Sequence, residues 1–217
     1  ILYDLASRVS EVAHSPEMQE HRRLWRNQNS FKGDRPLIYL RAFGFDETFD
    51  LSVLKCTDPF LRHYERELHQ ELYRSTLGDD YIVEPWLTLD ATYVMENGQR
   101  WGIPVALGEK PAGGGAAAFH PSLVEEDISC LRAAPYEVNE EDTARRAERL
   151  SEALGGAMRV FVSRQGPYSM WSGDISTDLA KMRGLEQLMW DTYDNPEWLH
   201  TLLAFMRDAI LANLEQA

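Results

Sequence analysis

Cysteine, basic residues and long apolar runs are all scarce in this chain of 217 residues. Cys56 and Cys130 are the only cysteines, and they form no Cys-x-x-Cys pair. We expect no secretory leader. We therefore expect reduced thiols and a cytoplasmic location. No apolar run reaches the ~18 residues of a membrane span, so no membrane association is expected.

Basic residues number 22 against 35 acidic residues, which gives a formal net charge of −13. This balance repels phosphate backbones, so we expect no nucleic-acid partner. The densest basic clusters, at 21–26 and 144–146, are interleaved with acidic residues or lie on predicted helices, as solvated helix faces do. The length suits one domain or part of a larger one.

Sequence motifs of phosphate loops, serine hydrolases and metal sites are missing. The segment KPAGGGAAAFHP at 110–121 lacks the Gly-Lys-Ser/Thr ending of a phosphate loop, so a surface loop is predicted. Glu65 and His69 are four residues apart, which fits a surface pair better than a zinc site without a third ligand. We expect no metal bound by this chain alone.

Turn and cap residues divide the chain into alternating elements. Strand-forming runs predict strands over 36–41, 81–87 and 158–164. Proline, capping residues and apolar spacing predict helices over 3–14 and 16–29, from Pro59 to Gly78, and from Asn139 to Gly155. WGIPVAL is expected to form a short β-piece within an otherwise irregular region at 88–136.

The stretch GLEQLMWDTYDNPEWLH at 184–200 predicts two helix ends and one helix start. Gly184 is expected to end a helix that begins at Ser176 or Thr177. Apolar residues at helical spacing then predict one buried face: Leu185, Leu188, Met189 and Tyr193. The pair Asn195-Pro196 predicts the start of a last helix that continues to the end of the chain.

The order of elements predicts an α/β protein with a parallel sheet, because parallel neighbours need crossover helices. Three strands alone would leave both sheet edges unpaired. We therefore expect the N-terminal portion of a TIM barrel in a single domain over 1–217. Extra helices would occupy 1–30, and the first three β/α units would occupy 36–217. An N-terminal piece is expected to be missing, and the last helix is expected to lead to an absent strand.

The segment ISTDLAKMRGLEQLMWDTYDNPEWLHTLLAFMRDAILANLEQA resembles a region of the uroporphyrinogen decarboxylase superfamily. There, a helix that ends in glycine precedes a leucine-rich turn, Tyr-Asp-x-Pro-Glu and a long helix. PLIYLRAFGF, LGDDYIVEPWL and APYEVNEEDTARRAERLSEALGGAMRVFVSRQGPYS resemble the first three strand regions in the same order, so the resemblance covers roughly 15–217. It implies a TIM-barrel enzyme, either a porphyrinogen decarboxylase or a methyltransferase that uses corrinoids or thiols.

The resemblance implies catalytic roles for Arg41 and Glu84. Arg41 matches the first of two arginines that hold substrate carboxylates in the decarboxylases, while Phe45 stands at the second position. Glu84 lies about one position from the aspartate that ends the second strand there, and Pro85 follows it. The departures at Phe45 and Pro85 favour methyl transfer over decarboxylation. A salt bridge is the alternative role for Arg41, and pairing with Arg41 or Arg164 is the alternative role for Glu84.

Side chains at the carboxyl ends of barrel strands face the active site. On that basis we expect seven substrate-binding residues: Phe43, Trp86, Arg164, Gln165, Tyr168, Trp171 and Asp174. The aromatic members suit a flat or cationic ligand, with ordinary packing as the alternative.

The leading hypothesis is methyl transfer between a small methylated substrate and a corrinoid or thiol. The alternatives are porphyrinogen decarboxylation and a non-catalytic, ligand-binding barrel. The resemblance implies a corrinoid protein as a partner and zinc supplied by a missing C-terminal half, which a second chain could also provide.

Overall fold

The computed structural model describes residues 1–41, 44–94, 100–109, 117–124, 126–166, 168 and 174–216. The chain divides into two compact units. Unit 1 comprises Ile1–Leu89 and Ala144–Val162, and unit 2 comprises Asp90–Thr143 and Ser163–Ala217. This division was not predicted from the sequence, and the single domain over 1–217 stays a prediction.

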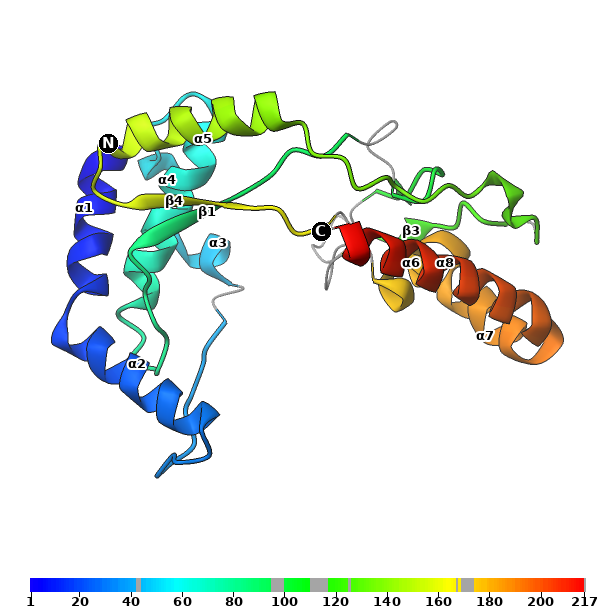
Figure 1. Cartoon of the computed structure of the whole chain (residues 1–217), viewed down its shortest axis with the longest axis horizontal. Coiled ribbons are helices and arrows are strands. Elements are labelled where there is room, and N and C mark those ends of the chain that lie inside the picture. Colours follow the sequence, from blue (N-terminus) through cyan, green and yellow to red (C-terminus); the bar gives the residue numbers. More distant parts are fainter. Residues whose placement is uncertain are drawn as a thin grey trace. The chain divides into compact units, whose positions relative to one another are not determined.

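Unit 1 is built from helices and one pair of strands (Figure 1). In chain order these are α1 (Leu2–Ala13), α2 (Pro16–Asn29), α3 (Phe45–Thr48), the short 3₁₀ helix η1 (Leu51–Val53), α4 (Pro59–Arg74), β1 (Trp86–Asp90), α5 (Glu140–Leu154) and β4 (Arg159–Ser163).

Three helix starts lie where the sequence predicts them, because each has a side-chain cap. The Ser15 hydroxyl accepts a hydrogen bond from the Met18 N–H at 3.3 Å at the start of α2. Asp58 caps α4 through the Leu61 N–H at 3.0 Å. Asn139 caps α5 in the same way.

β1 and β4 form a parallel pair. The Ala91 N–H, just after β1, donates to the Ser163 carbonyl at the end of β4 at 2.8 Å, so the two carboxyl ends lie side by side. Figure 1 shows both strands running in the same direction. This pairing gives the described chain a mixed α/β architecture, as the sequence predicts.

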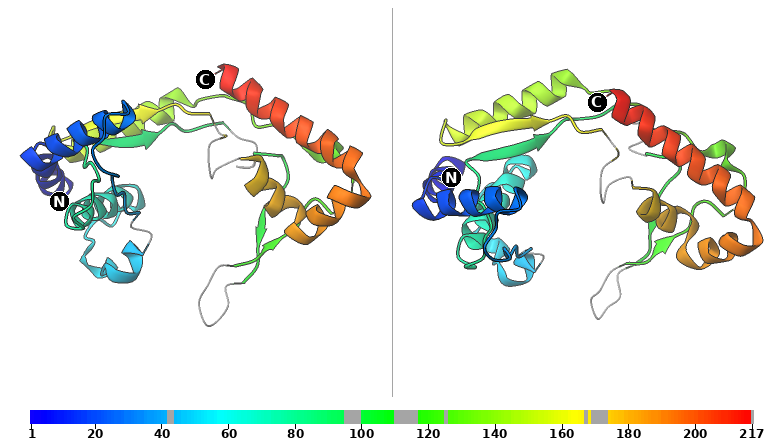
Figure 2. Two further views of the ribbon diagram at one scale, coloured as in Figure 1. Left: turned by 90° about the horizontal axis from the view of Figure 1, so that it is seen from below. Right: turned by 60° about the horizontal axis from the view of Figure 1, so that its bottom comes forward.

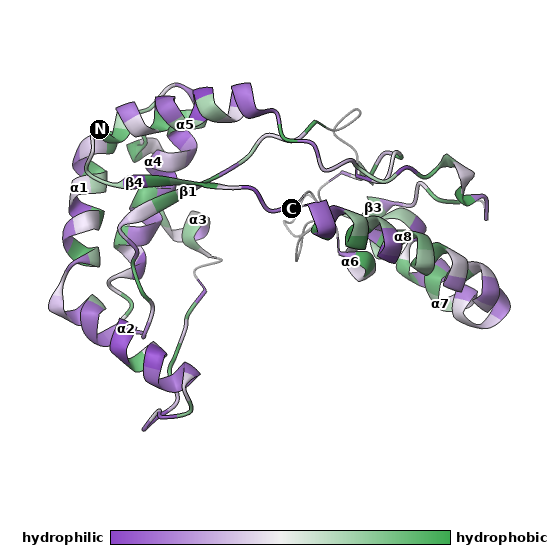
Figure 3. Ribbon diagram, viewed as in Figure 1, coloured by the Kyte–Doolittle hydropathy of each residue, from purple (hydrophilic) through white to green (hydrophobic). Residues whose placement is uncertain are grey.

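One face of the β1–β4 pair carries the core of unit 1. Leu87 and Leu89 of β1 are buried, and Val160 and Val162 of β4 pack against the same core. Helices α1, α4 and α5 supply most of the rest of it, together with Met18 of α2, and Figure 3 shows hydrophobic residues on the sides of α1, α4 and α5. The opposite face of the pair is exposed from Trp86 to Asp90 at alternate positions.

The strand predicted over 36–41 does not form. The segment has no regular secondary structure, and two of its N–H groups are bound by carboxylates instead of a neighbouring strand. Asp80 accepts from the Ile38 N–H at 2.8 Å, and Asp79 accepts from the Leu40 N–H at 2.7 Å. Because these N–H groups already donate to carboxylates, they are not available for the backbone hydrogen bonds that pair two strands.

The strand predicted over 81–87 is displaced to Trp86–Asp90. Backbone groups before Pro85 already have other partners. The Val83 N–H faces the Met18 sulfur at 3.3 Å, and the Val83 carbonyl accepts from Arg22 at 3.1 Å. Pro85 itself has no N–H, so regular pairing begins only after it.

The described part of unit 2 contains an antiparallel pair of short strands followed by helices (Figure 2). Its elements are β2 (Ala106–Leu107), β3 (Phe119–His120), the 3₁₀ helix η3 (Ile128–Cys130), α6 (Ile175–Arg183), α7 (Leu185–Asp194) and α8 (Pro196–Gln216). β2 and β3 pair antiparallel, with Ala106 opposite His120 and Leu107 opposite Phe119. β2 confirms the β-piece predicted in WGIPVAL.

Helix α6 begins at Ile175, one or two residues earlier than predicted, because Asp174 caps it through the Thr177 N–H at 2.9 Å. Gly184 ends α6 with φ +83°, a conformation that favours glycine. α8 then begins at Pro196 as predicted.

The helix face predicted to be buried on α7 is wrong for most of its members. Leu188 packs against the core of unit 2, but Leu185, Met189 and Tyr193 are exposed, Tyr193 at 85%. Helix α7 contacts α6 and α8, and its least exposed side carries Leu188 and the fully buried Asp191, three residues apart. Apolar spacing identified the helix but not the side that packs.

Within the described ranges each sheet has two strands, and no closed sheet is formed. No helix in the same ranges combines the length and the apolar character that crossing a membrane requires.

Candidate functional site

Polar and aromatic side chains of unit 2 gather where β1 and β4 end. We call this group the strand-end cluster; its members are Asp90, Thr92, Tyr93, Tyr136, Glu140, Arg164 and Gln165. Thr92 anchors the segment after β1, since its hydroxyl donates to Asp142 at 2.7 Å and its N–H donates to the Thr143 hydroxyl at 3.0 Å.

Arg164 and Glu140 form a two-pronged ion pair in this cluster. Nε and Nη2 of Arg164 donate to the two carboxylate oxygens of Glu140 at 3.1 and 2.9 Å. The guanidinium lowers the pKa of Glu140, and the carboxylate raises the pKa of Arg164. Both side chains are exposed, so the pair orients the loop after β4 more than it stabilises the fold.

Two tyrosines hold the backbone that follows β4. The Tyr136 hydroxyl donates to the Arg164 carbonyl at 2.9 Å, and the Tyr93 hydroxyl donates to the Gln165 carbonyl. Their ring centroids lie 5.8 Å apart, and burial raises the pKa of Tyr93. The two residues predicted to bind substrate here, Arg164 and Gln165, therefore lie together on a backbone segment fixed from the side.

Asp90 is the last residue of β1, on its exposed face. Among the described residues no hydrogen-bond or ion-pair partner engages its carboxylate, although its charge contributes to the raised pKa of Tyr93. An exposed carboxylate at a strand's carboxyl end is available to accept a proton or a hydrogen bond. Asp90 was not predicted from the sequence, because the predicted strand ended at residue 87 whereas β1 ends at Asp90.

Asn213 of α8 presents a second available acceptor. Its Nδ2 donates to the Ala134 carbonyl at 2.9 Å, but its buried Oδ1 has no donor among the described residues. A Cβ added to Gly166 would lie 3.7 Å from that oxygen, so the amide lies against the loop after β4. A polar residue in the apolar stripe of α8 was the sequence signal for this position.

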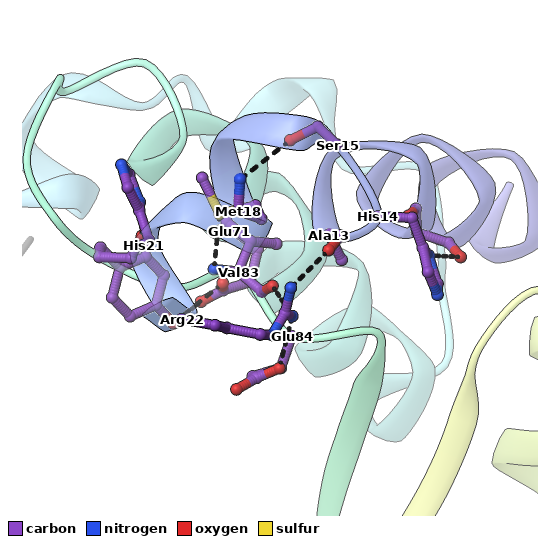
Figure 4. Close-up of polar contacts among 11 residues, drawn as sticks. Ala13, His14, Ser15, Met18, His21, Arg22, Glu71, Val83 and Glu84 are labelled. Carbon is purple, nitrogen blue, oxygen red and sulfur yellow. Dashed lines mark hydrogen bonds and ion pairs between the residues drawn. The ribbon is translucent and has the colours of Figure 1, made fainter. Parts of the chain in front are cut away.

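Glu84 lies elsewhere, in unit 1, before the amino end of β1. Its Oε2 accepts from Arg22 Nη2 at 2.8 Å (Figure 4). Arg22 also donates to the Ala13 and Val83 carbonyls at 2.9 and 3.1 Å. Glu84 thus pairs with an arginine, as the alternative prediction stated, but the arginine is Arg22 instead of Arg41 or Arg164.

A second carboxylate of unit 1, that of Glu71, also has a hydrogen-bond partner. Both oxygens of Glu71 lie 3.0 Å from the Tyr81 hydroxyl, which donates to them. Burial raises the pKa of Glu71 and of Tyr81. Nδ1 of His21 lies 2.8 Å from the Tyr81 carbonyl, so Tyr81 has polar contacts with both α2 and α4.

The other predicted site residues are dispersed. Trp86 starts β1 and meets the Phe161 ring edge-on at 5.6 Å. Tyr168 is buried in unit 2, where its hydroxyl accepts from the Ala134 N–H and donates to the Arg100 carbonyl. Asp174 caps α6.

Arg41 is exposed and takes part in an interaction, whereas Phe43 and Trp171 lie outside the described residues.

In the part of the chain that the structure describes, no group of three or more His, Cys, Asp or Glu side chains is arranged to hold a metal ion. No family model, curated protein or solved structure matches the chain.

Proposed function

We propose that this chain belongs to the uroporphyrinogen decarboxylase superfamily, with a TIM barrel, and transfers a methyl group between a small methylated substrate and a corrinoid or thiol. The observation that carries the proposal is the unengaged carboxylate of Asp90 at the carboxyl end of β1, beside the end of the parallel strand β4. Catalytic groups of TIM barrels lie at this end of the strands. The family resemblance in the segment after β4 supports the same assignment.

In this proposal the Asp90 carboxylate accepts the proton that an acceptor thiol loses as it takes the methyl group. The Asn213 Oδ1 can accept a hydrogen bond from the substrate, since no described donor occupies it. Tyr93 and Tyr136 hold the loop that would face the substrate, through its backbone carbonyls.

Charge favours methyl transfer over decarboxylation of a porphyrinogen with many carboxylates. Arg164 is already held by Glu140 in a two-pronged pair. The net charge of −13 further disfavours a polyanionic substrate at long range. A neutral or cationic methylated compound meets no such barrier.

Decarboxylation is the second candidate, and one observation favours it. The decarboxylases of the family carry an aspartate at the end of the second barrel strand, and β1, predicted as that strand, ends with Asp90. Asp90 fits that position better than Glu84, which Arg22 engages.

Zinc, which the family's methyltransferases use, is not assigned to these residues. Cys56 is half-buried, and burial together with the nearby Glu65 carboxylate raises the pKa of its thiol. Cys130 is exposed, and its thiol donates to the Asp127 carbonyl at 3.4 Å. These thiols do not supply a three-ligand set in the described part of the chain, so no step here depends on zinc.

The test is a pair of assays on the purified protein. Methylcobalamin with 2-mercaptoethanol reports methyl transfer through the cobalt absorbance, and uroporphyrinogen reports decarboxylation through released carbon dioxide. We expect methyl transfer, reduced about 100-fold or more in Asp90→Asn, because a general base contributes on that order.

Asp194→Asn, which changes an exposed carboxylate on α7, is the matched control and should keep full activity. Carbon dioxide release that depends on Asp90 would select the second candidate. Activity in neither assay, with the protein folded, would leave only the non-catalytic barrel.

A further inference from the structure

A pocket in unit 1 lies at the amino ends of β1 and β4, the opposite end of these strands from Asp90. Its volume is about 420 Å³, within the range of small-molecule sites, roughly 300–1,000 Å³. The lining residues come from α1, from the start of β1 and from the turn into β4: Ser10, His14, Pro85, Trp86, Gly156, Ala157, Met158, Arg159 and Phe161. We call it the amino-end pocket.

Aromatic and apolar groups form most of its wall. Trp86 and Phe161 meet edge-on with ring centroids 5.6 Å apart and an interplanar angle of 79°. Both rings remain partly open to solvent, Trp86 at 38% and Phe161 at 51%. Two perpendicular rings at a pocket wall offer one face and one edge to a planar guest.

His14 supplies a directional polar group. Its Nδ1 lies 2.7 Å from the Ser10 carbonyl, and a carbonyl can only accept, so Nδ1 carries the hydrogen. In the neutral ring the lone pair is therefore on Nε2. A ligand hydroxyl can donate to that nitrogen.

Arg159 supplies a positive charge at the same pocket. Its side chain is exposed, and among the described residues no carboxylate pairs with it. In a chain of net charge −13, an arginine left without an acidic partner beside an aromatic wall suits a carboxylate.

Gly156 lines the pocket without placing a side chain in it. Gly156 has φ +83°, and a Cβ built on it would meet no atom within 4 Å. Neighbouring Gly155 differs, because its Cβ would come within 2.9 Å of the Tyr3 ring. The space therefore lies on the Gly156 side of the turn.

We propose that the amino-end pocket binds a small aromatic acid that carries a ring hydroxyl. The ring lies against Trp86 and Phe161, the carboxylate pairs with Arg159, and the hydroxyl donates to His14. This site is separate from the strand-end cluster and does not depend on the function proposed above.

The probe is 4-hydroxybenzoate, titrated into the purified protein by isothermal titration calorimetry. We expect saturable binding at one site per chain. Arg159→Gln should weaken it about tenfold or more, because a charge-assisted hydrogen bond contributes on that scale. Phe161→Leu, which keeps apolar volume but removes the ring, should weaken binding less than Arg159→Gln does.

Two comparisons make the result specific. Arg207→Gln removes an exposed arginine of α8, in unit 2, and should leave the affinity unchanged. Cyclohexanecarboxylate keeps the charge but has neither an aromatic ring nor a hydroxyl, and should bind more weakly than 4-hydroxybenzoate. Absence of saturable binding by the unmodified protein, or equal affinity in Arg159→Gln, would overturn the proposal. Because Arg159 is exposed, circular dichroism of this variant is expected to match the parent.

Discussion

The guanidinium of Arg22 lies 2.8 Å from the carboxylate of Glu84 and also binds the carbonyls of Ala13 and Val83. One side chain of α2 thus joins the end of α1 to the segment before β1 (Figure 4). Glu84, expected from the sequence to be catalytic, has a structural role in this arrangement.

Arg22→Ala should therefore destabilise unit 1. The substitution leaves two carbonyls and a half-buried carboxylate without their donor, and a lost partner of this kind costs about 1–3 kcal/mol. Urea denaturation would measure the change in the free energy of unfolding.

The neighbouring Arg23→Ala provides the control. Among the described residues Arg23 forms an ion pair with Glu20 three residues away, and both side chains are about half exposed. Such surface pairs contribute roughly 0–1 kcal/mol. Equal losses of unfolding free energy in the two variants would show that the contacts of Arg22 with Ala13, Val83 and Glu84 do not stabilise unit 1.

The same junction explains why the sequence predicted helices better than strands. Helix starts at Pro16 and Pro59 depend on local caps, which neighbouring residues supply. The start of β1 depends on Met18 and Arg22, more than 60 residues away in the chain. No local pattern in YIVEPWL contains that information, so the strand was placed about five residues early.

A buried ion pair in unit 2 predicts a dependence on pH. Arg183 binds both carboxylate oxygens of Asp191 at 2.6 and 2.9 Å, and both side chains are almost fully buried. The hydrogen bonds from Arg183 lower the pKa of Asp191. Its contribution is thus complete above the unfolded-state value of ~3.9 and is lost as the pH falls through the lower folded-state pKa.

Asp191→Asn should destabilise the protein by about 3–5 kcal/mol at pH 7, because it leaves the Arg183 charge buried without its counter-charge. The difference from the parent should shrink below pH 4. Urea denaturation at pH 7 and pH 3 measures both effects. Asp194→Asn, at an exposed position of the same helix, should change the free energy of unfolding little at either pH. If Asp191→Asn destabilised the protein equally at pH 7 and pH 3, the proposed dependence on the ionisation of Asp191 would be refuted.

Tyr168 tests whether a residue predicted to bind substrate acts structurally. Its hydroxyl bridges the Ala134 N–H and the Arg100 carbonyl, at 2.8 and 2.9 Å. Tyr168→Phe should cost about 1 kcal/mol in unfolding free energy, because it removes the two hydrogen bonds of the hydroxyl while the Ala134 N–H keeps its 2.9 Å bond to the Arg100 carbonyl. KM should stay unchanged in the assay that proves active. Tyr193→Phe on exposed α7 is the control for stability, and a raised KM in Tyr168→Phe would restore the predicted binding role.

The candidate site could be predicted only in part, for a physical reason. Arg164 and Gln165 were found because β4 lies where its apolar run predicts it. Asp90 was missed because contacts of Val83 with Met18 and Arg22 shift the whole of β1 toward the C-terminus, so that it ends at Asp90 instead of residue 87. Tyr136 and Asn213 come from other segments, and only the folded chain brings them to the loop after β4.

Two glycines with the same φ allow conformational strain to be separated from steric conflict. Gly184 and Gly156 both have φ +83°, which costs a residue with a Cβ roughly 1–3 kcal/mol. A Cβ at Gly184 would also come within 2.9 Å of the Pro121 ring, whereas one at Gly156 would meet open space. Gly184→Ala should thus destabilise more than Gly156→Ala, by about 1–3 kcal/mol of overpacking. Thermal and urea unfolding of the two variants measure the difference. Similar losses would mean that Pro121 moves aside freely, and that the turn between α6 and α7 is fixed by backbone conformation alone.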